Sequence, residues 1–310
     1  MKIVFFGTPD IAAKILSELV KTGHEVVGVV SKPDKPKGRS QRLEPPEVKV
    51  EALKSLPNIP IFQPVKCSTA ETAESLRALQ ADIFVVVAFG EIISQEILNI
   101  PPLGCINIHA SLLPKYRGAA PMQRALWHGE SETGISIIKM VRKMDAGEVL
   151  YREALPIGIN MTLGELESEL CSLASKCLHK TLQAIENKTV VAVAQDEALV
   201  TFADKIDPQE CLIDWSKTAT EIHNQIRALS PHPGAYCYIM VRGEKKRLKI
   251  LRSELVSEAA GPGKTITTSK NGIEVACSKG VIRLITIQLE GKPIMASSDF
   301  LKGTPQFLLA

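Results

Sequence analysis

A short apolar segment of this chain carries two polar residues whose types and spacing could support catalysis. In Cys105-Ile-Asn-Ile-His109, an amide and an imidazole stand two positions apart. Alternate side chains of a β-strand lie on one face, so we expect Asn107 and His109 to point the same way, with backbones about 6 to 7 Å apart. An amide can donate to a developing oxyanion, and an imidazole can transfer a proton. The pair predicts an acyl-transfer centre, although a hydrogen-bonded core histidine would give the same pattern.

An acidic residue on a separate predicted loop could complete this centre. Asp145 stands in the turn Asp145-Ala-Gly147, between strands predicted at 135–141 and 148–151. A carboxylate beside His109 would stabilise the imidazolium form. An α-amine nucleophile would need no activated serine or cysteine, because an ordinary pKa of about 7.7 leaves roughly a third of it neutral at pH 7.4. On its own, Asp145 would be read as an ordinary turn residue.

These side chains must be positioned by a fold, and the first 150 residues alternate short β-type runs with helical patterns. That alternation predicts a Rossmann-like parallel sheet covered by helices. The expected strands are 2–7, 25–31, 59–62, 82–88 and 104–109, with helices at 10–21, 70–79 and 121–128. A long helix is expected at 162–187, and residues 188–206 are expected to be extended.

The rest of the chain changes character, with one helix followed by several short strands. We expect the helix at 216–229 and strands at 235–241, 247–254, 264–268, 273–277 and 281–287. Short, closely spaced strands predict a small β-barrel similar to the oligonucleotide-binding (OB) fold. The predicted organisation is a catalytic domain over 1–188, a linker over 189–206 and a β-barrel domain over 207–310.

Composition narrows the class of protein. The chain has 310 residues, 45% of them hydrophobic, and a formal net charge of +3. These values predict a soluble protein, and the lack of a signal-like segment or a membrane-length apolar run predicts a cytoplasmic one. Seven scattered cysteines without a Cys-x-x-Cys pair predict reduced thiols and no metal site.

The chain as a whole resembles the folate-dependent formyltransferases, and among them those that act on initiator methionyl-tRNA. The motifs that carry this resemblance are Phe5-Phe-Gly-Thr-Pro9, Val85-Val-Val-Ala-Phe-Gly90, Gly104-Cys-Ile-Asn-Ile-His109, Ser111-Leu-Leu-Pro114, Arg117-Gly-Ala-Ala-Pro121, Glu132-Thr-Gly134 and Met144-Asp-Ala-Gly147. The resemblance implies formyl transfer from 10-formyltetrahydrofolate to the α-amine of methionine on initiator tRNA. We also expect a monomer that uses no metal and binds no membrane.

The resemblance assigns roles to individual residues. It implies that Asn107, His109 and Asp145 are catalytic. The residues that it places against the folate are Ser111, Leu112, Leu113, Pro114, Phe89, Gly90, Glu91 and Ile92.

The sequence has two basic clusters, for which the resemblance implies a use in binding tRNA. The first lies in residues 32–42, and the second contains Arg242, Lys245, Lys246, Arg247, Lys249 and Arg252. The resemblance implies an inserted, mobile, basic loop over 32–49. The expected tRNA-binding residues are Lys37, Arg39 and Arg42 on this loop and Lys245, Lys246 and Arg247 in the second domain. Two positions depart from the family pattern: Gln41 stands where a basic residue is common, and Ala110 where glycine is frequent.

Several alternative functions compete with this hypothesis. A dinucleotide-dependent oxidoreductase is disfavoured because Gly7-Thr-Pro-Asp-Ile-Ala12 is not a Gly-x-Gly-x-x-Gly phosphate cradle. A non-catalytic RNA-binding protein would leave the Asn-His-Asp set without a purpose. Formyltransferases acting on amino-sugar nucleotides and the hydrolase part of formyltetrahydrofolate dehydrogenases have a similar two-domain length. The sequence Arg117-Gly-Ala-Ala-Pro-Met-Gln-Arg124 and the basic loop favour tRNA over both.

Overall fold

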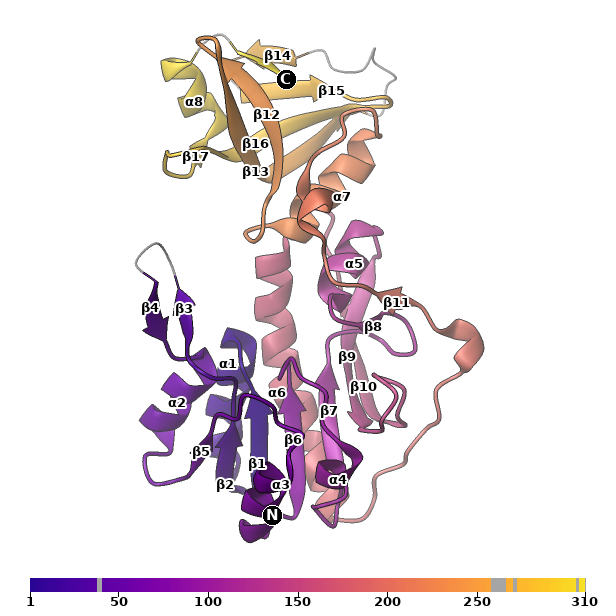
Figure 1. The fold of residues 1–310 in the computed structure, drawn as a ribbon. Coiled ribbons are helices and arrows are strands. Elements are labelled where there is room, and N and C mark those ends of the chain that lie inside the picture. The colour runs from indigo at the N-terminus through magenta and orange to yellow at the C-terminus, as the bar shows by residue number, and fades with distance from the viewer. Residues whose placement is uncertain (38–40, 258–265, 270–271, 305–306, 310) are drawn as a thin grey trace. The chain divides into compact units, whose positions relative to one another are not determined.

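The computed structural model describes residues 1–37, 41–257, 266–269, 272–304 and 307–309, which form two compact units (Figure 1). The first unit consists of Met1–Gly118, Gly134–Leu155 and Glu167–Phe202. The second unit consists of Ala119–Thr133, Pro156–Leu166 and the segment from Ala203 to the C-terminus. Each unit has its own sheet.

The first unit is built on a seven-stranded sheet with the order β10-β9-β7-β6-β1-β2-β5. The strands are β1 (Lys2–Gly7), β2 (Glu25–Val30), β5 (Ile61–Phe62), β6 (Ile83–Val87), β7 (Cys105–His109), β9 (Glu132–Lys139) and β10 (Val149–Pro156). Neighbouring strands in the part β5-β2-β1-β6-β7 of this order are parallel, and β9 runs antiparallel to β7. Nearly continuous apolar side chains in β1 and β6 are buried, as expected for strands covered on both faces.

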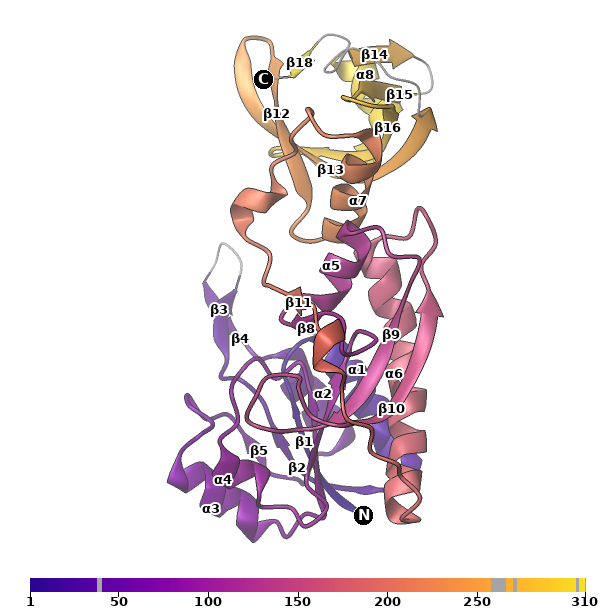
Figure 2. The same ribbon diagram turned by 90° about the vertical axis from the view of Figure 1, so that its right-hand side faces the viewer.

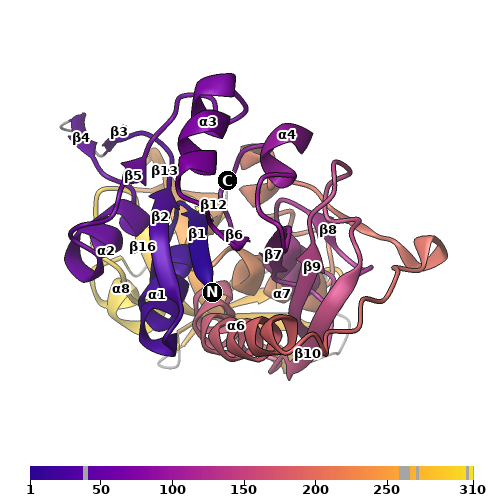
Figure 3. The ribbon, with the colours of Figure 1, turned by 90° about the horizontal axis from the view of Figure 1, so that it is seen from below.

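Helices cover both faces of this sheet (Figure 3). The α-helices of the first unit are α1 (Asp10–Leu19), α2 (Glu47–Ser55), α3 (Ala70–Ala78), α4 (Gln95–Leu98) and most of α6 (Leu163–Glu186). Helix α1 buries an apolar stripe at helical spacing, including Ala12, Ile15 and Leu19. On the face covered by α3, the rings of Phe6, Phe84 and Phe89 pack together, so the chain just beyond β6 is anchored in the core.

The expected loop 32–49 contains regular structure. A short hairpin, β3 (Lys35–Lys37) and β4 (Arg42–Glu44), is followed by α2. Helix α2 begins at Glu47 because Pro46, with φ of −63° and ψ of 151°, is an extended N-cap residue after which the helix can start. Arg39 lies outside the described residues, and Lys37 and Arg42 are paired positions of the hairpin backbone.

The second unit is mainly β (Figure 2). Its sheet has the order β14-β15-β16-β13-β12-β18, with β17 paired to β16. The strands are β12 (Ala235–Val241), β13 (Glu244–Ser257), β14 (Ile266–Ser269), β15 (Gly272–Ala276), β16 (Val281–Leu289), β17 (Met295–Ala296) and β18 (Leu308–Leu309). Helices α5 (Pro121–Trp127), α7 (Ala219–Leu229) and α8 (Ser297–Gly303) accompany them. The prediction of a parallel-sheet α/β domain followed by a mainly β domain is confirmed.

The remaining elements are short. They are β8 (Arg117–Gly118), β11 (Phe202–Ala203) and three turns of 3-10 helix at Val20–Thr22, Glu197–Leu199 and Pro208–Cys211. Strand β8 pairs with β11. In the described part of the chain, no helix is both long and apolar enough to cross a membrane.

Candidate active site

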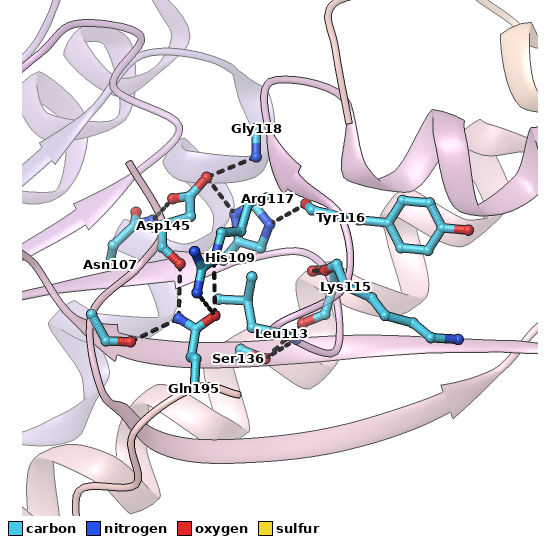
Figure 4. Close-up of polar contacts among 12 residues, drawn as sticks. Asn107, His109, Leu113, Lys115, Tyr116, Arg117, Gly118, Ser136, Asp145 and Gln195 are labelled. Atoms are coloured by element: carbon cyan, nitrogen blue, oxygen red, sulfur yellow. Dashed lines mark hydrogen bonds and ion pairs between the residues drawn. The ribbon is translucent and has the colours of Figure 1, made fainter. Parts of the chain in front are cut away.

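The candidate site lies where β6 and β7 end. These two strands are parallel neighbours, so the chain leaves both of them at the same edge of the sheet. Asn107 and His109 are the last two alternate positions of β7. They point toward the same region, as their spacing predicted (Figure 4).

Asp145 reaches both of these side chains from the loop between β9 and β10. Its Oδ1 accepts a long hydrogen bond of 3.4 Å from Nδ2 of Asn107. Its Oδ2 lies 3.6 Å from Nδ1 of His109 and accepts the backbone N–H of Gly118 at 2.9 Å. The three residues that the sequence proposed as one centre are therefore brought together, although they come from two separate segments (Figure 4).

The histidine ring faces an oxygen atom at each nitrogen. Nε2 of His109 lies 2.8 Å from the carbonyl oxygen of Tyr116, and Nδ1 faces Asp145. An imidazolium can donate to both oxygens, whereas a neutral ring would turn one nitrogen lone pair toward an acceptor. Nε2 is engaged by the carbonyl, so Nδ1, at the longer distance, is the nitrogen that could turn to a reacting group. Side-chain exposure is only 6% for His109 and 12% for Asp145, so bulk water is largely excluded.

The turn after β7 is fixed by hydroxyl groups. Ser136 of β9 donates to the carbonyl of Ser111 at 2.7 Å and accepts the N–H of Leu113 at 3.0 Å. Ser111 in turn donates to the carbonyl of Lys115 at 2.7 Å, and Arg152 of β10 donates to the carbonyl of Leu113 at 2.7 Å. This network holds the 111–116 turn beside the site. Ala110 is not among the residues with a left-handed backbone, so alanine fits where the family pattern favours glycine.

Four of the residues expected to border the folate lie in this turn. Ser111 and Leu113 are fully buried, and Leu112 and Pro114 are partly exposed. The hydroxyl of Ser111 is used within the turn, so Leu112 and Pro114 are the two whose side chains remain accessible to a ligand.

The other four expected folate residues follow β6. Phe89 is 3% exposed, with its ring packed on Phe6 and its carbonyl held by Thr8 at 3.0 Å. Glu91 pairs with Lys32 at 2.9 Å, and Ile92 is 74% exposed. Gly90 has a left-handed backbone at φ of 76°, which glycine tolerates best. Backbone groups and Ile92 are thus the parts of this segment that a ligand could contact.

A polar network behind Asp145, built around the buried side chain of Arg117, escaped prediction from the sequence. Gln195 donates from Nε2 to the carbonyls of Asp145 and Gly147 and accepts from Arg117 at Oε1. Arg117 is 2% exposed and donates from Nη2 to Glu197 at 2.8 Å. The Arg117 guanidinium, followed by Lys143, lowers the pKa of Glu197 to about 2.

Cysteine chemistry is disfavoured at this site. All seven thiols are free and buried, as expected for reduced cysteines. Burial raises the pKa of Cys105, on the strand that carries His109, to about 12, so its thiol stays protonated at neutral pH. Within the described residues no group of three or more His, Cys, Asp or Glu side chains is arranged to hold a metal ion.

The predicted basic residues of the second unit separate onto two faces of β13. Lys245 lies over the ring of Tyr238 at 4.5 Å, and Arg247 lies over the ring of Tyr236 at 5.6 Å. Lys246 stands at the alternate position and pairs with Glu244 at 2.8 Å. The three neighbouring cations therefore do not form one patch, because side chains alternate along a strand. We call the face formed by Tyr236, Tyr238, Lys245 and Arg247 the tyrosine–cation face.

Comparison with known families identifies both parts of the chain as formyltransferase-like. Residues 1–182 match the family model "Formyl transferase", and residues 205–305 match "Formyl transferase, C-terminal domain". A solved structure of WlaRD, a sugar 3N-formyl transferase in the presence of dTDP and 5-N-formyl-THF, superimposes with a TM-score of 0.67. It is 24% identical and covers 94% of this chain and 99% of its own, so it supports the fold.

Relatives with higher identity define the branch of the family. A methionyl-tRNA formyltransferase of Protochlamydia amoebophila strain UWE25 is 43% identical over 98% of this chain and 95% of its own length. Another, from Citrifermentans bemidjiense, is 41% identical over 98% of this chain and 93% of its own. The chain belongs to the methionyl-tRNA formyltransferase family, and the resemblance inferred from its motifs is confirmed.

Proposed function

We propose that this protein transfers the formyl group of 10-formyltetrahydrofolate to the α-amino group of methionine carried by initiator tRNA. The observation that carries the proposal is the convergence of Asn107, His109 and Asp145 in a chain that is 43% identical to a methionyl-tRNA formyltransferase over 98% of its length. We expect the protein to act as a cytoplasmic monomer.

The transfer requires three tasks from the site. The amine nitrogen forms a bond to the formyl carbon, and the bond from that carbon to N10 of the folate breaks. Over the whole reaction the amine nitrogen loses one proton and N10 gains one, so no net proton is consumed. The intermediate carries an oxyanion that needs hydrogen-bond donors.

The side chains at the end of β7 match these tasks. Nδ2 of Asn107 donates to the oxyanion, an effect typically worth about 3 to 4 kcal/mol for one donor. His109 as imidazolium donates from Nδ1 to the departing nitrogen and then accepts the proton of the amine. Asp145, held by the N–H of Gly118 at 2.9 Å, stabilises the charged ring and orients Asn107.

The folate is proposed to lie along the two segments that leave the same sheet edge. Residues 89–92 offer a backbone anchored by Thr8 and the exposed side chain of Ile92. Residues 111–114 offer Leu112 and Pro114 beside the fixed turn. Both segments are anchored by hydrogen bonds to neighbouring elements, which favours binding because less order must be gained.

Two basic elements are proposed to bind the tRNA, each through phosphates. One is the basic segment 32–49, whose sequence contains Lys37, Arg39 and Arg42 and which includes the β3–β4 hairpin. The other is the tyrosine–cation face, where two cations could contact phosphates while the rings stack on unpaired bases.

A competitive formyl-transfer assay tests the proposal. Purified protein and 10-formyltetrahydrofolate are offered charged initiator tRNA, charged elongator tRNA and an amino-sugar nucleotide in parallel. We expect formylmethionyl-tRNA from the initiator. Formylation of the sugar nucleotide with none of the tRNA would refute the proposal.

A further inference from the structure

The amide of Gln195 bridges Asp145 and Arg117, two residues at the candidate site. Gln195 lies in the extended segment after α6, fifty positions from Asp145 in sequence. Its Nε2 donates to the carbonyl of Asp145 at 2.8 Å and to that of Gly147 at 2.7 Å. Its Oε1 accepts from Nε and Nη2 of Arg117 at 3.0 and 2.9 Å. Both ends of the amide are therefore fully used (Figure 4).

Only one orientation of this amide satisfies its neighbours. A guanidinium has donors alone, and a backbone carbonyl only accepts, so Oε1 must face Arg117 and Nε2 must face the loop. Arg117 is 2% exposed, and its Nη1 has no hydrogen-bond partner within the part of the chain that is described. Loss of the Gln195 oxygen would leave two further buried donors of this guanidinium unpaired, which is costly.

The loop that Gln195 holds has a backbone that needs support. Asp145 has φ of 51°, in the left-handed region that residues other than glycine adopt only when surrounding contacts impose it. On the opposite side, Gly147 is pressed against β9, because a Cβ at this position would overlap the carbonyl oxygen of Lys139. The loop is thus fixed between β9 and the amide of Gln195.

We propose that Gln195 is a positioning residue for formyl transfer, which acts by fixing the backbone of Asp145 so that its carboxylate meets His109 and the N–H of Gly118. The proposal rests on the proposed function for its kinetic consequence. Its structural consequence is independent of any substrate. A shift of about 1 Å in a reacting group can cost on the order of a hundredfold in rate, so loss of the two donated bonds should lower turnover.

The test combines Gln195→Met with Asp145→Asn. Methionine has similar volume and forms neither the two donations nor the acceptance. We expect Gln195→Met to lower kcat by about 10- to 100-fold with KM for both substrates within about twofold. In the Asp145→Asn background the same change should lower kcat by less than about threefold, since the group that it positions is already impaired. Without substrates, exchange of the Gly118 amide hydrogen should become at least about tenfold faster.

A matched control exists in the second unit. Gln225 also donates from one amide nitrogen to two carbonyls, those of Glu210 at 2.8 Å and Leu212 at 3.1 Å. Gln225→Met should leave kcat and Gly118 exchange unchanged while lowering the melting temperature. If Gln195→Met does not fold, Gln195→Glu serves instead, because it keeps an acceptor for Arg117 and loses both donations.

Three results would overturn the inference: equal losses of kcat in both backgrounds, a change confined to KM, or unaltered Gly118 exchange. If the wild-type protein formylates no tRNA, the proposed function has failed. The exchange measurement still decides whether Gln195 fixes the loop.

Discussion

Oδ2 of Asp145 lies 3.6 Å from Nδ1 of His109, while Nε2 of the same ring is engaged by a backbone carbonyl at 2.8 Å. The ring is thus oriented by the main chain, and the carboxylate faces the nitrogen that remains able to act. The distance exceeds a normal hydrogen bond, and catalytic contacts are often long before substrate binds. If the proposed roles hold, the site depends on the charge of Asp145 more than on its size.

Asp145→Asn should therefore lower kcat by about 10²-fold or more with little change in KM. The amide retains the shape of the side chain but loses the negative charge that stabilises the imidazolium, and a related substitution in a Ser-His-Asp triad costs about 10⁴. Steady-state kinetics with both substrates measure the effect. Asp82→Asn is a suitable control, because Asp82 precedes β6 at the amino end of the sheet, where its Oδ2 accepts the N–H of Lys2. Similar losses in both variants would contradict the assigned role.

His109→Ala should reduce kcat by about 10²- to 10⁴-fold, the range typical of a general acid–base residue. The affinity for tRNA should stay within about twofold, since the ring is nearly buried and its two nitrogens face the carbonyl of Tyr116 and the carboxylate of Asp145. Single-turnover rates and equilibrium binding of charged tRNA separate the two effects. A large loss of affinity with unaltered single-turnover rate would show that His109 has a structural role.

The parts of this site that the sequence predicted are those governed by local periodicity. Strand alternation alone places Asn107 and His109 on one face. The turn that carries Asp145 could be recognised from the residues of the turn itself, Asp145-Ala-Gly147. Gln195 could not be predicted in this way. Its contacts with the Asp145 loop depend on the path that the extended chain takes after α6, and no local pattern encodes that path. Alternation also explains why the run Lys245-Lys246-Arg247, read as one basic cluster, divides between two faces. The hairpin at 35–44 was missed because its short polar strands lack an apolar pattern.

The division of these three cations yields a matched comparison for tRNA binding. Lys245→Ala and Arg247→Ala should each weaken binding and flatten its dependence on salt, by roughly 0.7 to 0.9 in the slope of log K against log[salt] for each phosphate that is no longer neutralised. Lys246→Ala should change the slope little, since this side chain points to the other face and pairs with Glu244. Fluorescence anisotropy over a range of KCl concentrations gives the slopes. Equal slopes for all three variants would remove the tyrosine–cation face from the interface.

Substitutions in the basic segment 32–49 should also flatten the salt dependence of tRNA binding. Arg39→Ala and Arg42→Ala are each expected to reduce the salt slope, since arginine pairs readily with phosphate. Lys54→Ala is the control, because this exposed lysine lies in the last turn of α2 and pairs only weakly with Glu51 at 3.5 Å. If neither arginine variant alters the slope, the hairpin does not contact the phosphate backbone.

The stability of the second unit should fall with acidity because of His223. The side chain is 1% exposed, its Nε2 faces the carbonyl of Ile159 at 2.9 Å, and its Nδ1 lies 3.0 Å from the hydroxyl of Ser253. A neutral ring satisfies both partners, by donating to the carbonyl and accepting from the hydroxyl. Burial lowers the pKa of His223 below its ordinary value.

Below about pH 6.5 the unfolded chain consequently binds a proton that the folded chain does not. The free energy of unfolding should be fully retained above that pH and decline as the pH falls, by at most about 1.4 kcal/mol per pH unit for one proton. His223→Gln keeps a donor for the carbonyl and cannot titrate, so it should flatten this slope. His232→Gln, which changes an exposed histidine of the same unit, should leave the slope as it is.

Urea unfolding at several pH values between 5 and 8, followed by tryptophan fluorescence, provides the measurement. The chain has two tryptophans, and both Trp127 and Trp215 belong to the second unit, so the signal reports that unit. As the pH is lowered, the unfolded wild type gains a proton that the variant cannot bind. The wild type should therefore lose more stability than His223→Gln. If the stability difference between wild type and His223→Gln does not change with pH, the pKa of His223 is the same in the folded and unfolded states. The interpretation that folding keeps this ring neutral would then be wrong.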